Sequence, residues 1–537
     1  MSNSCLFDFF PVEIIHGIFH YLWAHEIFYG FAQLSDYVDS VLFSYDRYSV
    51  SLSSILKHQF DLTCRRIRPE QVISITIAEN DETPDQSDLF FSKFNLLQFV
   101  NLRSFAIMSS DQSIFRQLNL LCTFNYFQSL SLPQVSQAYW CLCGSSVETM
   151  LHRLRQLITN QYPLTTPLNN LRYLTVTHVG CFNLEYLFRQ TTNLRSLNMT
   201  LSLNAFSDWS NQIPVMNHLR RLTLWISFGR VPMSRMNQFL SKLPCLMHFE
   251  LRIDDPIDVV GAEQLRKWSQ YSNGDVEVPE DIVDGNQWKY LISHLQTFDF
   301  RFCLTHRSNE KILDTFRSSF WIEQKQWFVA YDNQESSSCL FTIPRFASKN
   351  VIYSPDYCTP SSTSSSLHLD EYVDVLTLPN VCRLTHRFVN ARSLILEKDD
   401  GLCLETILPF VNLPHLQSLT SVKASLMSLF LNYETKFESI RSLRIDAMVM
   451  GSHAKAICTV FPRLERLRIG ISDQDTVILL IDRLKYLSIA IFTYCHPLSF
   501  KSLSRKWLVD KSSRLMANNN FTCSMNTEKL SLWMSIE

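Results

Sequence analysis

Few residues of this 537-residue chain have a type and spacing suited to catalysis or metal binding. Cys141 and Cys143 are the only closely spaced pair among 15 cysteines, and no second pair accompanies them to complete a zinc site. The 15 histidines show no spacing typical of metal ligands. Glycine-rich phosphate loops, the H-E-x-x-H motif and the G-x-S-x-G motif are absent. We therefore predict a protein that is not an enzyme, with no catalytic residue, no metal site and no cofactor.

The composition narrows the class of partner. Lys and Arg number 49 against 51 Asp and Glu, a formal net charge of −2, so the chain lacks a bulk field that would hold nucleic acid or an anionic membrane. No charge-free stretch is apolar enough for a membrane span of about 20 residues. Dispersed cysteines and the lack of a basic segment before Arg47 predict an intracellular protein, cytoplasmic or nuclear.

Apolar residues at positions i, i+3 and i+5 recur through most of the chain. Four successive middle residues, at 174, 197, 222 and 249, are 23, 25 and 27 positions apart. Helical apolar spacing between the triplets, as in 236–243, ends at a proline. The clear triplets are Leu171/Leu174/Val176, Leu194/Leu197/Met199, Leu219/Leu222/Leu224, Leu246/Phe249/Leu251, Leu295/Phe298/Phe300, Ile440/Leu443/Ile445, Leu464/Leu467/Ile469 and Leu484/Leu487/Ile489.

This period resembles that of irregular leucine-rich repeats, which is about 20–29 residues. The asparagine or cysteine usual after each repeat strand is mostly missing, with Cys303 the one match. The fold class we predict is α/β: a small N-terminal three-helix domain over residues 1–50, followed by a strand-plus-helix solenoid over 51–537.

Two segments interrupt the repeats. Residues 254–286 contain nine acids and two bases, a net charge of −7, and are typical of a solvated loop or an acidic partner-binding finger. The second insertion, 303–372, includes a Ser/Thr tract at 359–366 that predicts a flexible loop.

The first 46 residues carry six acids and no lysine or arginine. Apolar residues between Ile14 and Leu22 have helical spacing, and two further short helices are predicted near residues 25–31 and 34–42. Three such helices enclose too small a core to be stable alone. An apolar face left over is therefore expected to find a partner.

The same segment resembles the F-box family in the run from Phe10 to Ile15, in Ile18 to Leu22, in Glu26-Ile27 and in Leu34. Phe10 stands where the family has leucine, and Glu26-Ile27 where it has aspartate-leucine. The resemblance implies that residues 1–50 dock on a Skp-type adaptor, and through it on a cullin scaffold, while the repeats bind an unknown protein substrate for ubiquitination by an SCF-type ligase. The residues implied to contact the adaptor are Phe10, Pro11, Val12, Ile14, Ile15, Ile18, Leu22, Ile27 and Leu34.

A second interpretation is a leucine-rich-repeat interaction scaffold unrelated to ubiquitination, in which the first helices cap the array. The two interpretations differ in whether the apolar face of residues 10–42 is exposed or packs onto residues 51–107.

Substrate-binding candidates follow from the strand geometry. Side chains that flank the inward apolar residues of a strand face the concave side of the array. Arg444, Arg466 and Arg468 would then lie on adjacent strands and attract an acidic or phosphorylated peptide, unless neighbouring acids pair with them. The full set of candidates is Arg221, Trp225, His248, Arg444, Arg466, Arg468 and Tyr486.

Overall fold

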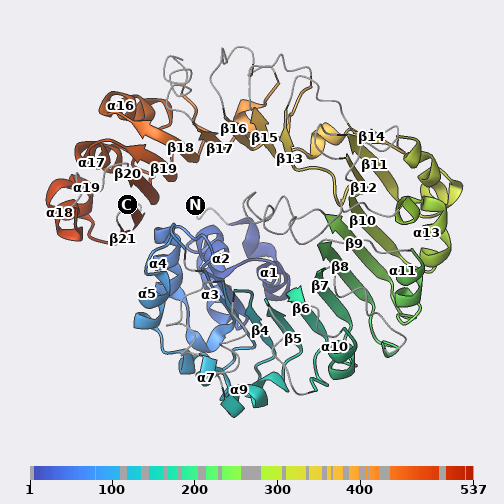
Figure 1. The fold of residues 1–537 in the computed structure, drawn as a ribbon. Coiled ribbons are helices and arrows are strands. Elements are labelled where there is room, and N and C mark those ends of the chain that lie inside the picture. Colours follow the sequence, from blue (N-terminus) through green and yellow to red (C-terminus); the bar gives the residue numbers. More distant parts are fainter. Residues whose placement is uncertain are drawn as a thin grey trace. The chain divides into compact units, whose positions relative to one another are not determined.

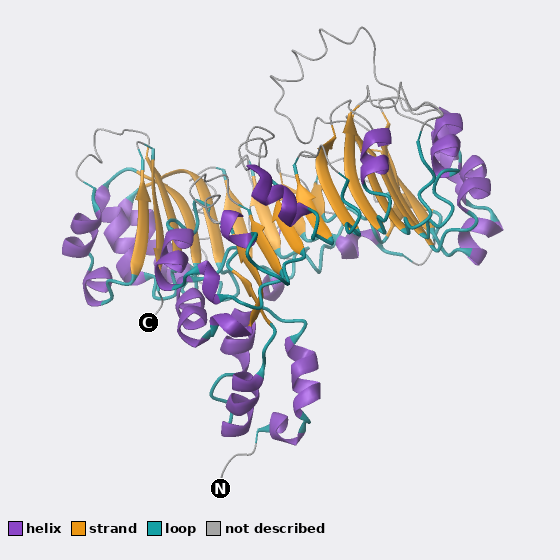
Figure 2. Cartoon of the chain, turned by 90° about the horizontal axis from the view of Figure 1, so that it is seen from below, coloured by secondary structure: helices purple, strands orange, loops and turns teal. Residues whose placement is uncertain are grey.

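The computed structural model shows a mixed α/β chain with long sheets of mainly parallel strands (Figures 1 and 2). Two compact units make it up: unit 1 comprises Met1–Leu120, Lys349–Asp356 and Val373–Glu537, and unit 2 comprises Leu121–Ser348 and Tyr357–Tyr372. The structure describes residues 5–78, 80–108, 118–134, 144–160, 167–179, 184–202, 213–227, 233–254, 280–304, 310–333, 338–353, 360–364, 367–378, 386–397, 407, 410–422, 436–494, 503–526 and 528–535.

Parallel strands form the main sheet of unit 2: β4 (Ser129–Leu132), β5 (Gln156–Thr159), β6 (Tyr173–Val179), β7 (Ser196–Ser202), β8 (Arg221–Ser227), β9 (His248–Asp254) and β10 (Thr297–Leu304). Its helices are α9 (Gly144–Leu151), α10 (Leu184–Gln190), α11 (Met233–Leu240) and α13 (Gly285–Ile292). Figure 1 shows α10, α11 and α13 on one side of strands β7–β10. We call the other side of these strands the helix-free face.

The predicted triplets set the register of this sheet. Leu174, Leu197, Leu222 and Phe249 are direct neighbours on successive strands, and Phe298 follows Phe249. All five are buried. Because strand side chains alternate between faces, the residues between the apolar ones point to the helix-free face. The prediction for these strands is confirmed.

Asparagine side chains just before three strands join neighbouring turns. Nδ2 of Asn170 donates to the carbonyl oxygen of His152 at 2.8 Å, and Nδ2 of Asn193 donates to that of Asn169 at 2.9 Å. Asn101 makes the same contact to Glu70 in unit 1, at 2.7 Å. In this chain, asparagine thus donates to backbone carbonyls before the strand. In the leucine-rich-repeat pattern it is expected after the strand.

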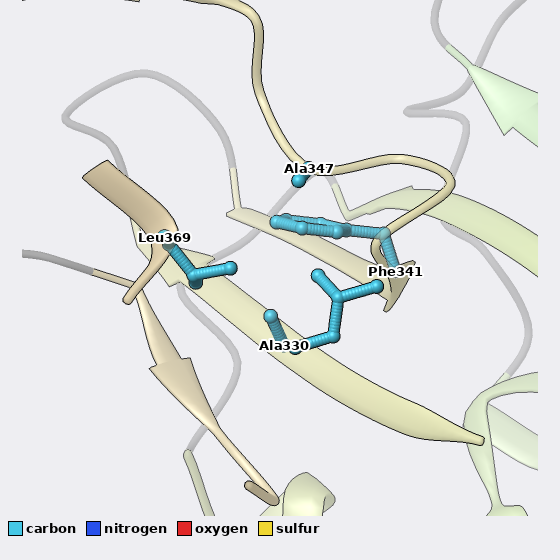
Figure 3. Close-up of a cluster of buried hydrophobic side chains, with 5 residues drawn as sticks. Ala330, Phe341, Ala347 and Leu369 are labelled. Atoms are coloured by element: carbon cyan, nitrogen blue, oxygen red, sulfur yellow. The ribbon is translucent and has the colours of Figure 1, made fainter. Parts of the chain in front are cut away.

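The insertion at 303–372 extends the sheet of unit 2 with antiparallel strands. β12 (Ser338–Ile343) pairs with β10, β11 (Phe328–Asn333) with β12, and β14 (Ser361–Ser362) with β11. Ala330, Phe341, Ala347 and Leu369 belong to a buried apolar cluster beneath these strands (Figure 3). The short helices are η6 (Glu280–Val283), η7 (Glu310–Phe316), η8 (Phe320–Gln324) and η9 (Leu369–Tyr372).

The structure corrects the expectation of a flexible Ser/Thr loop for part of that tract. Ser361 and Ser362 form an edge strand whose partners are Tyr331 and Ala330. Small hydroxyl side chains can lie against a buried strand, and backbone pairing decides the outcome here. In the acidic segment, residues 255–279 lie outside the described residues.

Unit 1 holds two sets of strands. The first is parallel: β1 (Tyr48–Ser51), β2 (Val72–Ile77) and β3 (Ser104–Ile107). The second is parallel from β13 to β20 and ends in two antiparallel strands: β13 (Asn350–Ile352), β15 (Val375–Leu378), β16 (Ser393–Leu396), β17 (Ser418–Ser421), β18 (Ser442–Val449), β19 (Arg466–Ile471), β20 (Ile489–Tyr494), β22 (Lys529–Met534) and β21 (Phe521–Met525). The helices that follow the first fifty residues are α4 (Lys57–Arg66), η2 (Pro69–Gln71), α5 (Gln86–Lys93), η3 (Leu96–Gln98), α7 (Leu118–Leu121, at the boundary with unit 2), η10 (Leu413–His415), α16 (Gly451–Val460), α17 (Gln474–Arg483), α18 (Arg505–Lys511) and α19 (Ser513–Ala517).

The last predicted triplet, Leu484/Leu487/Ile489, lies three residues before the positions that the structure aligns with the preceding strand. Leu467 of β19 has Ala490 as its neighbour on β20, where the sequence pattern placed Leu487. Leu487, Ala490 and Phe492 are the buried residues at the three equivalent positions. An alanine in the middle position hides the pattern, because alanine is not recognised as part of an apolar triplet.

The first and last parts of unit 1 pack on each other. The ring of Trp533 on β22 lies 5.0 Å from that of Phe60 on α4, and Nε1 of Trp533 donates to the carbonyl oxygen of Ile55. Nζ of Lys57 lies close to both rings, 2.7 Å from Oδ1 of Asp61 and 2.9 Å from Oδ1 of Asn520. The residues around Lys57 therefore close an internal interface between segments more than 400 positions apart in sequence.

The first fifty residues form η1 (Leu6–Phe9), α1 (Val12–Phe19), α2 (Ala24–Phe31) and α3 (Asp36–Ser44), near the helices predicted. Figure 2 shows these helices close to the N label. Their inner face is buried, and the rings of Phe28 and Tyr48 lie 5.0 Å apart. The helices of the first fifty residues pack on the elements that follow, because α2 contacts β1 and α4. They therefore belong to the same compact unit as those elements.

Candidate binding surfaces

The N-terminal helices also expose several large apolar side chains. Phe10, Pro11, Ile14 and Leu34 are exposed among the residues predicted to contact an adaptor, and Ile14 exposes 52 % of its surface. We call these residues and their exposed neighbours the N-terminal apolar surface: Leu6, Phe9, Phe10, Pro11, Ile14, Tyr21, Trp23, Tyr29 and Leu34. Tyr21 is 87 % exposed and Phe9 75 %.

Two of the predicted contact residues are core residues instead. Ile15 and Ile27 are 0 % exposed, because each lies on the inner face of its helix. Val12, Ile18 and Leu22 are half-buried. The sequence pattern identifies apolar positions, but it does not tell which face of so short a helix the remaining chain covers.

The prediction also missed part of the surface. Tyr21, Trp23 and Tyr29 were not among the predicted contact residues: Tyr21 follows α1 within the motif run Ile18 to Leu22, whereas Trp23, just before α2, and Tyr29, in α2, lie outside the motif. Their signal was available in the sequence, since three large aromatic residues fall at positions that flank the buried residues of these helices.

The N-terminal apolar surface carries acidic charge. Glu13, Glu26 and Asp36 are exposed. Burial lowers the pKa of His25 below its usual value, an effect that the neighbouring carboxylate of Glu26 opposes, so this imidazole adds no positive charge at neutral pH. A partner of this surface must therefore combine apolar contacts with tolerance of negative charge.

The three predicted arginines of unit 1 lie on adjacent strands, and two of them are paired with acids. Arg444 and Arg468 are direct neighbours on β18 and β19. Nε of Arg444 lies 2.8 Å from Oδ1 of Asp446 on its own strand. Nη1 of Arg466 lies 2.6 Å from Oε2 of Glu82, and its Nη2 donates to the carbonyl oxygen of Ser54. Arg468 is exposed, with no ion pair to any residue that the structure describes.

Arg466 is therefore part of the internal interface of unit 1. Tyr486 is exposed but lies in the turn before β20, a consequence of the three-residue shift in register. The basic patch predicted on these strands is reduced to one unpaired arginine among its described members.

Arg221, Trp225 and His248 lie together on the helix-free face of unit 2. Arg221 and His248 are neighbours across β8 and β9, and Nδ1 of His248 lies 2.9 Å from Oγ1 of Thr297. Partial burial and the Arg221 guanidinium lower the pKa of His248. Trp225 is half-buried, and the Arg252 guanidinium lies 6.0 Å from its ring.

Ion pairs neutralise the middle of this face. Oε1 of Glu250 accepts from Nε of Arg252 at 3.2 Å, and its Oε2 accepts from Nη2 of Arg345 at 2.9 Å. Burial raises the pKa of Asp299 next to this pair, and Oδ1 of Asp299 accepts from the Thr342 hydroxyl at 3.1 Å. The network holds β9, β10 and β12 together and offers few free charges to a ligand.

Thiol and metal chemistry gains little support from the part of the chain that the structure describes. No group of three His, Cys, Asp or Glu side chains able to hold a metal ion is present there. Cys141 and Cys143 lie outside the described residues. Sγ of Cys303 lies 3.1 Å from Sγ of Cys339 on the paired strand, and this contact is the main cause that lowers the pKa of Cys339.

No protein-family model matches the chain, and no curated protein matches it. Among the described helices, none has both the length and the apolar character that a membrane crossing requires.

Proposed function

We propose that the chain is a substrate-recognition adaptor of an SCF-type ubiquitin ligase, with an F-box in its first fifty residues and a leucine-rich-repeat-like array after it. The observation that carries the proposal is the set of large apolar side chains exposed on the N-terminal helices, which includes Phe10, Pro11 and Ile14 of the F-box-like motif. Large apolar side chains concentrated on one exposed face are typical of a protein-binding surface. Docking on a Skp-type adaptor would bury them.

The energetics suit such docking. Burying one side chain of this kind contributes about 1.5–3 kcal/mol. Phe9, Ile14 and Tyr21 are each more than half exposed. The chain would catalyse no bond chemistry itself, and would act by raising the effective concentration of substrate near the conjugating enzyme.

A pulldown with purified Skp-type adaptor tests the proposal, using the full chain and the double variant Pro11→Ala/Ile14→Asp. Both side chains are exposed, and an aspartate in the first turn of α1 is favoured by the helix dipole, so the variant is expected to fold. We expect binding by the native chain and at least a tenfold loss in the variant.

The matched control is Tyr290→Asp, which places the same charge at an 80 % exposed apolar residue of α13 in unit 2. It should bind like the native chain. Equal binding by the Pro11/Ile14 variant, with unchanged circular dichroism, would count against an F-box.

The second candidate is the interaction scaffold in which these helices serve as a cap. The packing of Phe28 on Tyr48 favours it, because the helices cover the first strand of the array. The two roles are compatible, since opposite faces of the helices serve them. Absence of adaptor binding by the native chain would leave the scaffold as the better description.

A further inference from the structure

Arginines precede four consecutive strands of unit 2 at equivalent positions. Arg155, Arg172, Arg195 and Arg220 come directly before β5, β6, β7 and β8. Their backbones are hydrogen-bonded in order, each N–H donating to the carbonyl oxygen of the preceding arginine at 2.8, 2.8 and 2.9 Å. Neighbouring strands lie about 4.8 Å apart, so four arginine residues follow one another at about this spacing along this edge of the sheet. We call these four residues the arginine ladder.

No acid neutralises the arginine ladder within the described part of the chain. None of the four side chains forms an ion pair there, although arginine pairs are present elsewhere in unit 2, such as Arg189 with Glu185 at 2.7 Å. Like charges on adjacent strands repel and destabilise the sheet. The hydrogen bond from Arg172 to the Asn193 carbonyl gives one of these arginines a structural role, but ion pairing gives no reason for a run of four.

Unit 1 shows what the fold requires at the equivalent positions. There the same backbone ladder passes through residues of alternating character, in the order Asp374, Arg392, Gln417, Arg441 and Glu465. Nε of Arg392 lies 3.8 Å from Oδ1 of Asp374, and Nε of Arg441 lies 3.8 Å from Oε1 of Glu465. The same strand geometry thus forms with self-neutralised charges, so the run of arginines in unit 2 needs an explanation outside the fold.

A hollow lies at this edge. It encloses about 310 Å³ and is lined by Arg155, Asn170, Arg172, Tyr173 and Arg195. Nη1 of Arg172 donates to the carbonyl oxygen of Asn193 at 3.1 Å, which fixes its guanidinium at the hollow. Arg155 and Arg195 are exposed on either side of it. Forked guanidinium donors at this spacing suit carboxylate or phosphate groups, which accept two hydrogen bonds at once.

We infer that the arginine ladder binds an extended polypeptide segment that carries several carboxylate or phosphate groups. An extended chain rises about 3.3 Å per residue, so about five residues reach from the first arginine to the last. A peptide fits better than a nucleic acid, because single-stranded nucleic acids are usually held by aromatic side chains on which successive bases stack. Tyr173 is the only aromatic residue among those that line the hollow, too few to stack successive bases.

Binding of an anionic peptide to the arginine ladder does not depend on the proposed function. If the chain is a ubiquitin-ligase adaptor, the arginine ladder would be its substrate site, and that role rests on the proposed function. This site differs from the one predicted at Arg444, Arg466 and Arg468, where acids of the chain occupy two of the arginines.

Fluorescence anisotropy with the full chain tests the inference. Three labelled decapeptides serve as probes, in which glycine alternates with glutamate, with phosphoserine or with glutamine. The variant Arg155→Gln/Arg195→Gln removes two exposed charges and leaves Arg172 with its structural hydrogen bond. The matched control Arg392→Gln/Arg441→Gln removes the same charge at the equivalent positions of unit 1.

We expect the native chain and the control to bind an anionic peptide and not the glutamine peptide. The variant should bind about tenfold more weakly for each arginine removed, and added salt should weaken all binding. The glutamate and phosphoserine peptides show which anion is preferred. Failure of both to bind, or equal loss in the control, would overturn the inference.

A labelled oligothymidylate tests the alternative that the arginine ladder binds nucleic acid. If it binds more tightly than either anionic peptide and loses that binding in the variant, the site is for nucleic acid and the peptide assignment is wrong. The Pro11→Ala/Ile14→Asp variant should bind peptide normally. Loss of adaptor binding without loss of peptide binding, or the reverse, therefore separates failure of the proposed function from failure of this inference.

Discussion

Nη1 of Arg466 lies 2.6 Å from Oε2 of Glu82, and the two residues are 384 positions apart in the sequence. The same guanidinium donates through Nη2 to the carbonyl oxygen of Ser54 at 2.7 Å. An arginine that the strand pattern assigned to a ligand is thus used to join β19 to the first part of unit 1. Two neighbouring contacts do the same, since Nζ of Lys529 lies 2.6 Å from Oδ2 of Asp81 and Thr522 donates to the carbonyl oxygen of Pro84.

Replacing Arg466 with alanine is expected to lower the stability of unit 1 by about 1–3 kcal/mol, because a partly buried carbonyl and a carboxylate both lose their charged donor. A double-mutant cycle with Glu82→Ala should give a coupling of about 0.5–1 kcal/mol, typical of a partly exposed pair. Urea unfolding of the four proteins measures it. Arg468→Ala, on the same strand and exposed, is the control and should change stability by less than about 0.5 kcal/mol. A coupling of zero would show that the contact adds nothing to the internal interface.

Removing the carboxylate of Asp61 should be more costly. Lys57 is 3 % exposed, and burial lowers its pKa while Asp61 opposes that shift. Asp61→Ala leaves a buried ammonium group without its acid, an effect worth about 3–5 kcal/mol.

The pH dependence of Asp61→Ala has a defined sign. Without Asp61, the folded-state pKa of Lys57 falls further below its unfolded value, and between these two values the unfolded chain binds more protons than the folded chain. Stability therefore rises with pH in that window, and the penalty should shrink between pH 7 and pH 10. Asp88→Ala, an exposed acid on α5, is the control. A penalty that stays constant with pH would show that Lys57 is not the group involved.

Asp299→Asn should stabilise unit 2 at neutral pH. Burial, with a smaller effect of Glu250, raises the pKa of Asp299 in the folded chain, although the Thr342 hydrogen bond and Arg345 oppose this. A raised pKa contributes stability below the unfolded value, and that contribution is lost as the pH rises through the folded value. Asparagine does not titrate, and its Oδ1 can still accept from Thr342. The urea midpoint of the variant should therefore exceed that of the native chain at pH 7, and by less at pH 4.

Asp314→Asn is the comparison for that change, since its carboxylate is exposed on η7 of the same unit. It should not raise the midpoint. If Asp299→Asn lowers the midpoint at pH 7, the charge of Asp299 stabilises unit 2 and the direction assigned to its pKa is wrong.

The spacing of apolar residues was sufficient to predict most of the local elements. Apolar triplets located strands β6 to β10 in register, and helical spacing located three short helices in the first fifty residues, because burial of one face requires a fixed period. The same rule failed at β20, where Ala490 fills the middle position. A small residue contributes too little apolar surface to be recognised without its neighbours.

Which apolar and charged residues remain available to partners depends on the folded chain and could not be predicted. Ile14 and Ile15 are adjacent and alike, but the inner face of α1 buries one and leaves the other exposed. Arg466 and Arg468 occupy one strand, and only Arg466 meets an acid from a distant segment. Exposure and charge pairing depend on contacts between segments far apart in the chain, and these contacts leave no period in the sequence.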